Sequence, residues 1–171
     1  MIEVEIDGLA MDLVSNSPVI VLASHSLNRV LPIWIGHNEA WAIAMEISGM
    51  GSKRPLTHDL FKTVIATLGG QLDRVEITEL KEQTFYARIH ISLDSKKFDI
   101  DARPSDSIAL ALKSQCPILV NEDLFQIKEE EPEGDQKPDS DKAAPPGASS
   151  PETLSDRLKR IDPEDFGKYS L

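Results

Sequence analysis

The chain has 171 residues, of which 40% are hydrophobic and 27% charged, a composition typical of one soluble domain with a proper core. Its formal net charge of −11 argues against a broad electrostatic grip on nucleic acid or on an anionic membrane, because such surfaces are usually basic. The single cysteine, Cys116, excludes an intrachain disulfide and favours a reducing compartment. With no signal-peptide pattern and no apolar run near the roughly 20 residues that span a bilayer, the sequence predicts a cytoplasmic protein that does not enter membranes.

The first part of the chain reads as strands followed by helices. Residues 2–6 alternate apolar and acidic side chains, which predicts a strand with one buried face. Residues 18–24 and 29–36 are β-branched and mostly apolar, as in buried strands. Residues 38–48 are apolar on nearly every side, so we expect a largely enclosed helix there. Residues 58–68 carry an apolar stripe and are followed by two glycines, which predicts a second helix and its stop.

The remaining patterns complete one domain. They predict three strands, a helix and a last short strand, over residues 74–80, 84–93, 96–102, 106–114 and 117–121. The order of three strands, two helices, three strands, a helix and a strand predicts an α+β fold. We expect a compact mixed domain with antiparallel hairpins and about three helices packed on the sheet.

Composition changes after Ile127. Residues 128–150 are rich in acids and proline and lack large apolar side chains. Such a segment cannot bury enough surface to offset its ordering entropy, which predicts a disordered linker. Residues 151–171 regain Leu154, Leu158 and Ile161 at helical spacing, which predicts a tail with a short helix, a candidate contact for a protein partner. The folded domain is therefore expected over residues 1–127.

The two strands before the last helix predict their own register. If Asp94-Ser95 forms a two-residue turn, His90 faces Asp99 and Arg88 faces Asp101. One face of the hairpin is then apolar and the other charge-matched, and a slip by one residue would destroy that sorting. The polar face is either simply solvated or continues into a functional site at the start of the next helix.

Two helices open in the same way, in the stretches RPLTHDL and RPSDS. Each has an arginine, a proline, a hydroxyl residue and an acid, with Arg54, Thr57 and Asp59 in the first and Arg103, Ser105 and Asp106 in the second. Proline holds the preceding arginine extended, the hydroxyl is a natural N-cap, and the helix dipole favours an acid in the first turn. These parts are sufficient for a rigid helix start. They also suit an anion, because free amides and a guanidinium bind phosphate oxygens.

Two further residues have alternative interpretations. His58 is either a surface histidine in a helix start or a general base or metal ligand. Glu39 is either a cap residue matched to the helix dipole or a carboxylate aimed at the site. The chain contains no glycine-rich phosphate loop, no GxSxG elbow and no HExxH motif, so known motifs do not decide between these alternatives.

The stretches LPIWIGHNEAWAI, RPLTHDL, TFYARIHI and DARPSDSIALAL, in this order and spacing, resemble the bifunctional nuclease domain family. The resemblance covers nearly all of residues 1–127. It implies a compact α+β domain, usually dimeric, credited with hydrolysing DNA and RNA, an attribution that rests chiefly on plant relatives. The departures are mild: Ser107 and Lys113 stand where relatives often have alanine and arginine. The C-terminal tail does not resemble the helical motif that some relatives append.

Because the resemblance supplies no established catalytic set, the candidate site is assembled from the chemistry of phosphodiester cleavage. That reaction needs neutralised phosphate charge, an activated water and a leaving-group acid. The candidates are His58, Asp101 and Glu39 for catalysis, Arg54, Arg103, Thr57, Ser105 and Tyr86 for substrate binding, and Asp59, Asp101 and Asp106 for metal. Mg²⁺ or Mn²⁺ would supply the positive charge that the chain lacks. The predicted function is a metal-dependent nuclease acting on DNA and RNA.

Two other interpretations stay open at this point. The domain could be a non-catalytic module that binds a nucleotide or another anion, or a structural dimer in which the Arg-Pro pairs only fix helix geometry. Trp34 and Trp41 are either homodimer contacts or core residues. The nuclease interpretation requires that Arg54, Arg103 and the neighbouring carboxylates line one cleft.

Overall fold

The computed structural model describes residues 1–126. Their elements are β1 (Ile2–Asp12), β2 (Ser17–Ser24), β3 (Arg29–Trp34), α1 (His37–Ile47), α2 (Thr57–Thr67), β4 (Gln71–Lys81), β5 (Thr84–Leu93), β6 (Lys96–Ala102), α3 (Pro104–Ser114), β7 (Ile118–Val120) and the 3-10 helix η1 (Glu122–Gln126). The predictions of a linker over residues 128–150 and of a helix within residues 151–171 lie outside the described residues.

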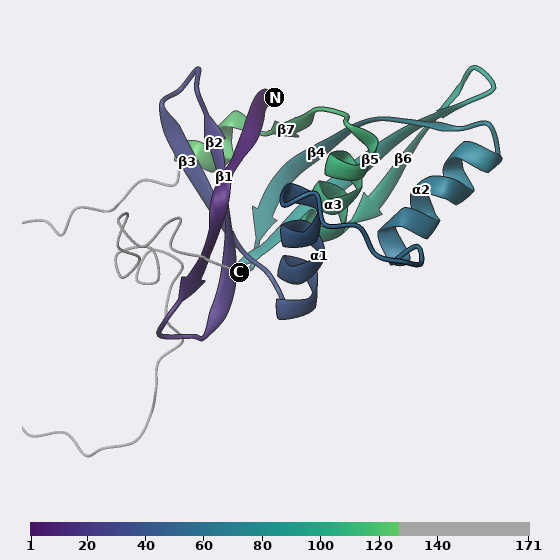
Figure 1. Ribbon diagram of the computed structural model, residues 1–171. Helices are drawn as coiled ribbons and strands as arrows, with labels where there is room; N and C mark the ends of the chain where they lie inside the picture. The colour runs from purple at the N-terminus through teal and green to yellow at the C-terminus, as the bar shows by residue number, and fades with distance from the viewer. Residues whose placement is uncertain (127–171) are drawn as a thin grey trace, which may run out of the picture.

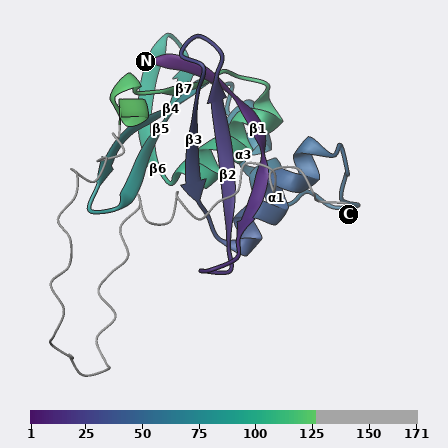
Figure 2. The ribbon, with the colours of Figure 1, turned by 90° about the vertical axis from the view of Figure 1, so that its left-hand side faces the viewer.

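One mixed sheet runs through the described domain, in the strand order β3-β2-β1-β7-β4-β5-β6. Its neighbours are antiparallel except β4 and β7, which are parallel. The short strand β7 joins the two halves, because it pairs with β1 on one side and with β4 on the other (Figures 1 and 2). The predicted α+β class, with hairpins and three helices, is confirmed.

The helix α3 lies at the centre of the helical layer, in contact with the sheet and with the other two helices. It packs on β4 and β5, and α1 and α2 each pack against it (Figure 1). Its residues Ser107 to Ala111 are buried, and the small side chains among them let the neighbouring helices approach closely. None of the helices in residues 1–126 is long and apolar enough to cross a membrane.

The predicted register of the β5–β6 hairpin is confirmed. Asp94 and Ser95 form the turn with φ of 48° and 67°, as a two-residue hairpin turn requires, and His90 pairs with Asp99 across the strands. The apolar face is less covered than its pattern predicts. Phe98 and Ile100 stay substantially exposed, because β6 is the edge strand and α2 does not cover it.

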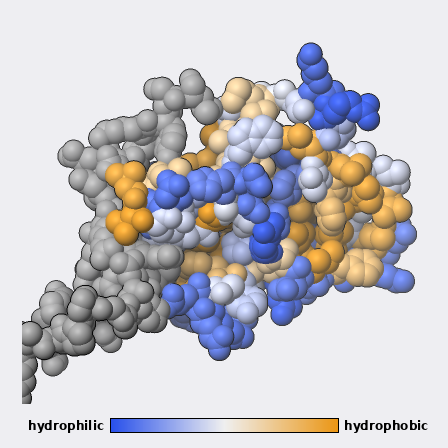
Figure 3. Space-filling model, turned by 90° about the horizontal axis from the view of Figure 1, so that it is seen from below, coloured by the Kyte–Doolittle hydropathy of each residue, from blue (hydrophilic) through white to orange (hydrophobic). Residues whose placement is uncertain are grey.

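Two helices bury less than their sequences predict. The helix α1 was expected to be largely enclosed, but Ile43 alone among its residues is buried, since α1 packs mainly on β2 and α3. No residue of α2 is buried, and its apolar stripe remains at the surface. Figure 3 shows apolar side chains gathered on the right of the face seen from below, the side where α2 lies in Figure 1.

Candidate functional site

The first turns of three helices meet at Arg103. Its guanidinium donates from Nε and Nη2 to Asp106, at 2.7 and 3.2 Å, and from Nη1 to Glu39 Oε1 at 3.0 Å. His58 Nε2 lies 3.1 Å from Asp106 Oδ1. These four residues, here called the Arg103 cluster, join α1, α2 and α3 across up to 64 positions of sequence.

The local sequence explains how Arg103 is held. Pro104 occupies the first turn of α3, a position that proline favours because the amide it lacks would be unpaired there anyway. Arg103 is therefore the N-cap, extended at φ −71° and ψ 147°, as a residue before proline should be. The prediction that Ser105 is the N-cap is wrong, since Ser105 lies inside the helix and is buried.

A similar shift occurs at the start of α2. Thr57 was predicted as its N-cap, but the cap is Leu56 and Thr57 is the first helical residue. Asp59 reaches back instead, and its Oδ2 accepts a hydrogen bond from the Leu56 amide at 2.9 Å. This is the returning half of a capping box, in which an acid at the third helical position caps the chain before it.

Gly36 determines where the Glu39 carboxylate can lie. Gly36 is the N-cap of α1, and Glu39 is the acid in the first turn that follows. A Cβ at position 36 would overlap Glu39 Oε2, so glycine leaves the space in which that carboxylate folds back. From this position Glu39 reaches Arg103.

Asp106 and Arg103 are held in their charged forms. Partial burial acts to raise the pKa of Asp106, but hydrogen bonds from Arg103 and His58 outweigh it, and the pKa lies below its ordinary value. The hydrogen bond from Arg103 to Asp106, with the charge of that carboxylate, raises the pKa of the guanidinium. In the tautomer that carries its proton on Nε2, His58 donates to the Asp106 carboxylate, and Nδ1 is then the nitrogen that can accept a proton.

Asp59 belongs to a different contact. Its Oδ1 lies 2.6 Å from Lys113 Nζ, and the same ammonium lies 2.8 Å from Glu46 Oε2. The hydrogen bond from Lys113 lowers the pKa of Asp59, and the Lys113 side chain is only 10% exposed. Asp59 thus ties α2 to α3, away from the Arg103 cluster.

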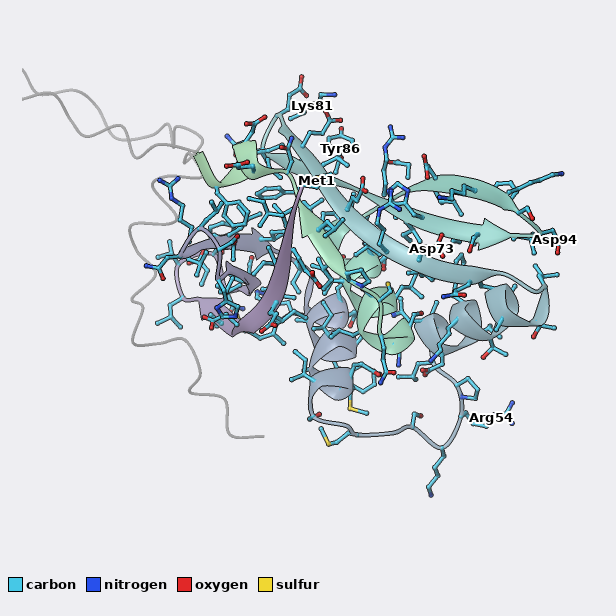
Figure 4. All side chains as sticks on the ribbon, turned by 90° about the horizontal axis from the view of Figure 1, so that it is seen from above. Met1, Arg54, Asp73, Lys81, Tyr86 and Asp94 are labelled. Carbon is cyan, nitrogen blue, oxygen red and sulfur yellow. The ribbon has the colours of Figure 1, made fainter. Side chains whose placement is uncertain are left out.

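Three other predicted site residues form no hydrogen bond or ion pair with the Arg103 cluster. Arg54 is exposed in the connection between α1 and α2, and Figure 4 shows it at the outer end of that connection. Tyr86 on β5 and Asp101 on β6, opposite Arg88, contribute to a hollow of about 650 Å³ that also includes His58, Arg103 and Asp106. Lys81 Nζ is 5.9 Å from the Tyr86 ring centroid (Figure 4). Within residues 1–126, Arg103 therefore lies in the predicted cleft and Arg54 does not, so the expected meeting of two arginines is not found.

The carboxylates near the cluster do not fit a divalent metal as they are arranged. Residues 1–126 contain no group of three or more His, Cys, Asp or Glu side chains placed to hold one ion. Both oxygens of Asp106 contact Arg103, and those of Asp59 contact Lys113 and a backbone amide. A metal would have to displace these cations.

Hollows of about 560 and 650 Å³ lie on two sides of the cluster. Both are lined by Thr57, His58, Arg103 and Asp106. The first lies between α1 and α2 and includes Trp41, whereas the second lies between α2 and the β5–β6 hairpin and includes Phe61. The four shared residues therefore lie at the boundary between the two hollows.

Several of these features were not recognised in the sequence. The role of Gly36 depends on the direction of a side chain three residues later, and that of Lys113 on the approach of two other helices. The apolar stripe containing Phe61 was recognised, but its exposure was not. Trp41 was considered as a dimer contact or a core residue rather than as part of a hollow.

The helix starts of this α+β domain thus gather an imidazole, a guanidinium and two carboxylates, groups with which proteins commonly bind anions and transfer protons. Residues 20–133 match the bifunctional nuclease domain, and the chain belongs to that family. The resemblance noted in the sequence is confirmed.

Among similar proteins, an uncharacterized protein from Mycobacterium tuberculosis (strain ATCC 25618 / H37Rv) is 45% identical over 120 residues, 70% of this chain and 71% of that protein. Bifunctional nuclease 2 of Arabidopsis thaliana is 23% identical over 112 residues, 64% of this chain and 34% of its own. Bifunctional nuclease 1 of Oryza sativa subsp. japonica is 24% identical over 95 residues, 54% of this chain and 29% of its own. The chain thus spans about a third of these plant relatives.

Proposed function

We propose that this protein is a nuclease that hydrolyses phosphodiester bonds of DNA and RNA, with the Arg103 cluster as its active site. The observation that carries the proposal is the chain of contacts from His58 through Asp106 to Arg103, which supports His58 as the base and Arg103 as the group that binds the phosphate. Membership of the bifunctional nuclease domain family and the printed names of the plant relatives support it.

Each residue of the cluster has a distinct role in this proposal. Arg103, with 65% of its side chain exposed, binds the non-bridging oxygens of the phosphate. His58, oriented by Asp106, accepts the proton of the attacking water on Nδ1 as the water oxygen bonds to phosphorus. The bond from phosphorus to the leaving sugar oxygen then breaks, and that oxygen takes a proton from the imidazolium or from solvent. Glu39 keeps the guanidinium in place through Nη1.

Removal of the base tests the proposal directly. His58→Ala should lower the rate of cleavage of labelled DNA and RNA oligonucleotides by about 10²–10⁴-fold, the usual contribution of a general base. Arg103→Ala should lower it as well. The matched control is His25→Ala, because His25 is an exposed histidine that contacts only Glu5 among the ion pairs of residues 1–126. Wild-type rates in a purified His58→Ala protein would refute the assignment.

Dependence on Mg²⁺ or Mn²⁺ stays a prediction, and it is motivated by charge. The cluster contains two carboxylates and one guanidinium, and the net charge of the chain is −11. A phosphate that binds there is therefore attracted by little positive charge. EDTA should therefore stop cleavage and either ion should restore it. Full activity in EDTA would show that His58 and Arg103 are sufficient without a cation.

A binding module that does not cleave is the alternative at the same cluster. Arg103 and the hollows beside it could retain a nucleotide or another anion without hydrolysis. Nucleotide binding that Arg103→Ala abolishes, in a protein that shows no cleavage with either metal, would favour this alternative.

We also propose that the protein forms a homodimer. Leu60, Val64 and Leu68 lie on one side of α2, and all three are exposed in the described domain. They are better candidates for the contact than Trp34, whose Nε1 donates to Asp12 at 3.0 Å. Sedimentation velocity would exclude the dimer if the full chain stays monomeric at micromolar concentration.

A cytoplasmic location and a protein partner for the C-terminal tail stay predictions. Cell fractionation would test the location, and a pull-down with a tail-deleted control would test the partner.

A further inference from the structure

We propose that the two hollows beside the Arg103 cluster each take one nucleobase, so that the site selects single-stranded nucleic acid. The assignment of the two hollows to the two sides of the scissile phosphate rests on the proposed function. In this arrangement the phosphate lies at Arg103, on the boundary between the two hollows, and the bases of the two flanking nucleotides enter the hollows.

The aromatic residues of the hollows carry this inference. Trp41 is 54% exposed and lines the hollow between α1 and α2. Phe61 is 49% exposed and lines the hollow between α2 and the β5–β6 hairpin. Large aromatic side chains usually bury more of their surface than this, and a base is a flat partner that stacks on either ring.

The second hollow has the lining that a stacked base needs. Besides Phe61, it includes the apolar side chains of Ile89, Ile100 and Leu110. Thr57 contributes to both hollows, and its hydroxyl can donate to or accept from a base edge or a sugar. Apolar walls with a few polar groups at the rim are typical of sites for planar ligands.

Charge also favours base contacts over backbone contacts. With a net charge of −11 the protein cannot hold many phosphates at once, and Arg103 is the arginine that the cluster offers to one of them. Binding must then depend on stacking. A duplex keeps its bases paired and stacked on each other, so it cannot place them in the hollows, whereas a single strand can.

The test compares Phe61→Ala and Trp41→Ala with Phe98→Ala in the full chain. Phe98 is an exposed aromatic residue of β6, 43% exposed, that lines neither hollow. Binding of a labelled single-stranded oligonucleotide, followed by fluorescence anisotropy in the His58→Ala background, should weaken about tenfold or more for each hollow variant and stay unchanged for the control. Trp41→Phe should retain most of the affinity, because its ring still stacks.

Two further readouts belong to the same experiment. A hairpin duplex should bind weakly to all variants, and the logarithm of the single-strand binding constant should fall with the logarithm of salt concentration with a slope of about −0.7, the value for one neutralised phosphate. With the active protein, Phe61→Ala should raise KM for single strands and leave kcat nearly unchanged, which a purely structural change would not do.

The outcomes separate this inference from the proposed function. Cleavage that prefers no strand type and is insensitive to both hollow variants would overturn the inference and leave the nuclease proposal intact. Binding that depends on Phe61 and Trp41 without any cleavage would contradict the nuclease proposal alone. Unchanged binding together with a shifted sedimentation coefficient in Phe61→Ala would also overturn the inference, because the hollow would then be a contact between copies of the chain.

Discussion

At the scale of single residues, Gly36 decides the geometry of the cluster although it carries no functional group. The space left by its missing side chain is filled by the carboxylate of Glu39, which from there receives a hydrogen bond from Arg103. Glu39 in turn limits the directions in which the guanidinium can point. A glycine without a functional group thus sets the direction of the Arg103 guanidinium.

Gly36→Ala should therefore reduce activity without unfolding the protein. The added Cβ would push the Glu39 carboxylate away and release Arg103 on one side, and we expect kcat/KM to fall several-fold. The free energy of unfolding should change by less than about 1 kcal/mol, because the overlapping atoms are the mobile end of a side chain. Gly8→Ala is the matched control, since a Cβ there would meet nothing within 4 Å. Equal activity in both variants would contradict this role.

At the scale of elements, Lys113 links the three helices and fixes how α1 and α2 are placed against α3. Its ammonium contacts Glu46 of α1 and Asp59 of α2 from its own place on α3. Partial burial acts to lower the pKa of Lys113, but the two carboxylates outweigh it and the pKa is raised. The orientation of α2 matters for the proposed function, since His58 lies in the same turn as Asp59.

Replacing Lys113 by methionine should loosen this link. We expect Lys113→Met to lower the free energy of unfolding by about 1–3 kcal/mol, because two partly buried carboxylates would lose a charged donor. Lys113→Arg should retain most of the stability, since a guanidinium can serve both carboxylates. Urea unfolding measures both, with the exposed Lys97→Met as control. A loss of the same size in the control would show that the link is not responsible.

At the scale of the whole molecule, several carboxylates are stabilised in their ionised form. Partial burial acts to raise the pKa of Asp12, Glu76 and Asp106, but hydrogen bonds outweigh it, and the hydrogen bond from Lys113 lowers that of Asp59. All four pKa values lie below their ordinary range. The folded protein therefore binds fewer protons than the unfolded chain when these groups begin to titrate.

The sign of the pH dependence follows from these directions. A lowered pKa in the folded state contributes stability that is present above the ordinary carboxyl pKa of about 4 and is lost as the pH falls through the folded value. The urea midpoint should thus decrease between about pH 5 and pH 3, and less so in Asp59→Asn and Asp106→Asn. The relief of repulsion in a chain of net charge −11 acts in the opposite direction. A midpoint that rises on acidification would show that repulsion outweighs the local contacts.

Local rules predicted a large part of the fold. The β5–β6 register follows from alternation and from a turn at Asp94-Ser95, because both depend on neighbours in the chain. The extended conformation of Arg103 follows from Pro104 in the same way. The candidate site was predictable in part: Glu39, His58, Arg103 and Asp106 were all identified, but the contacts that His58 and Glu39 make between helices were not.

By itself, the sequence determined the strand faces, the helix starts and the residue types available for chemistry. Only the tertiary structure decided that the two similar Arg-Pro helix starts differ, with Arg103 inside the cluster and Arg54 outside it. It also decided that Asp106 meets His58 across 48 positions whereas Asp59 meets Lys113. The physical reason is that a local motif sets the direction of a side chain relative to its own helix. The packing of α1 and α2 on α3 determines what lies in that direction.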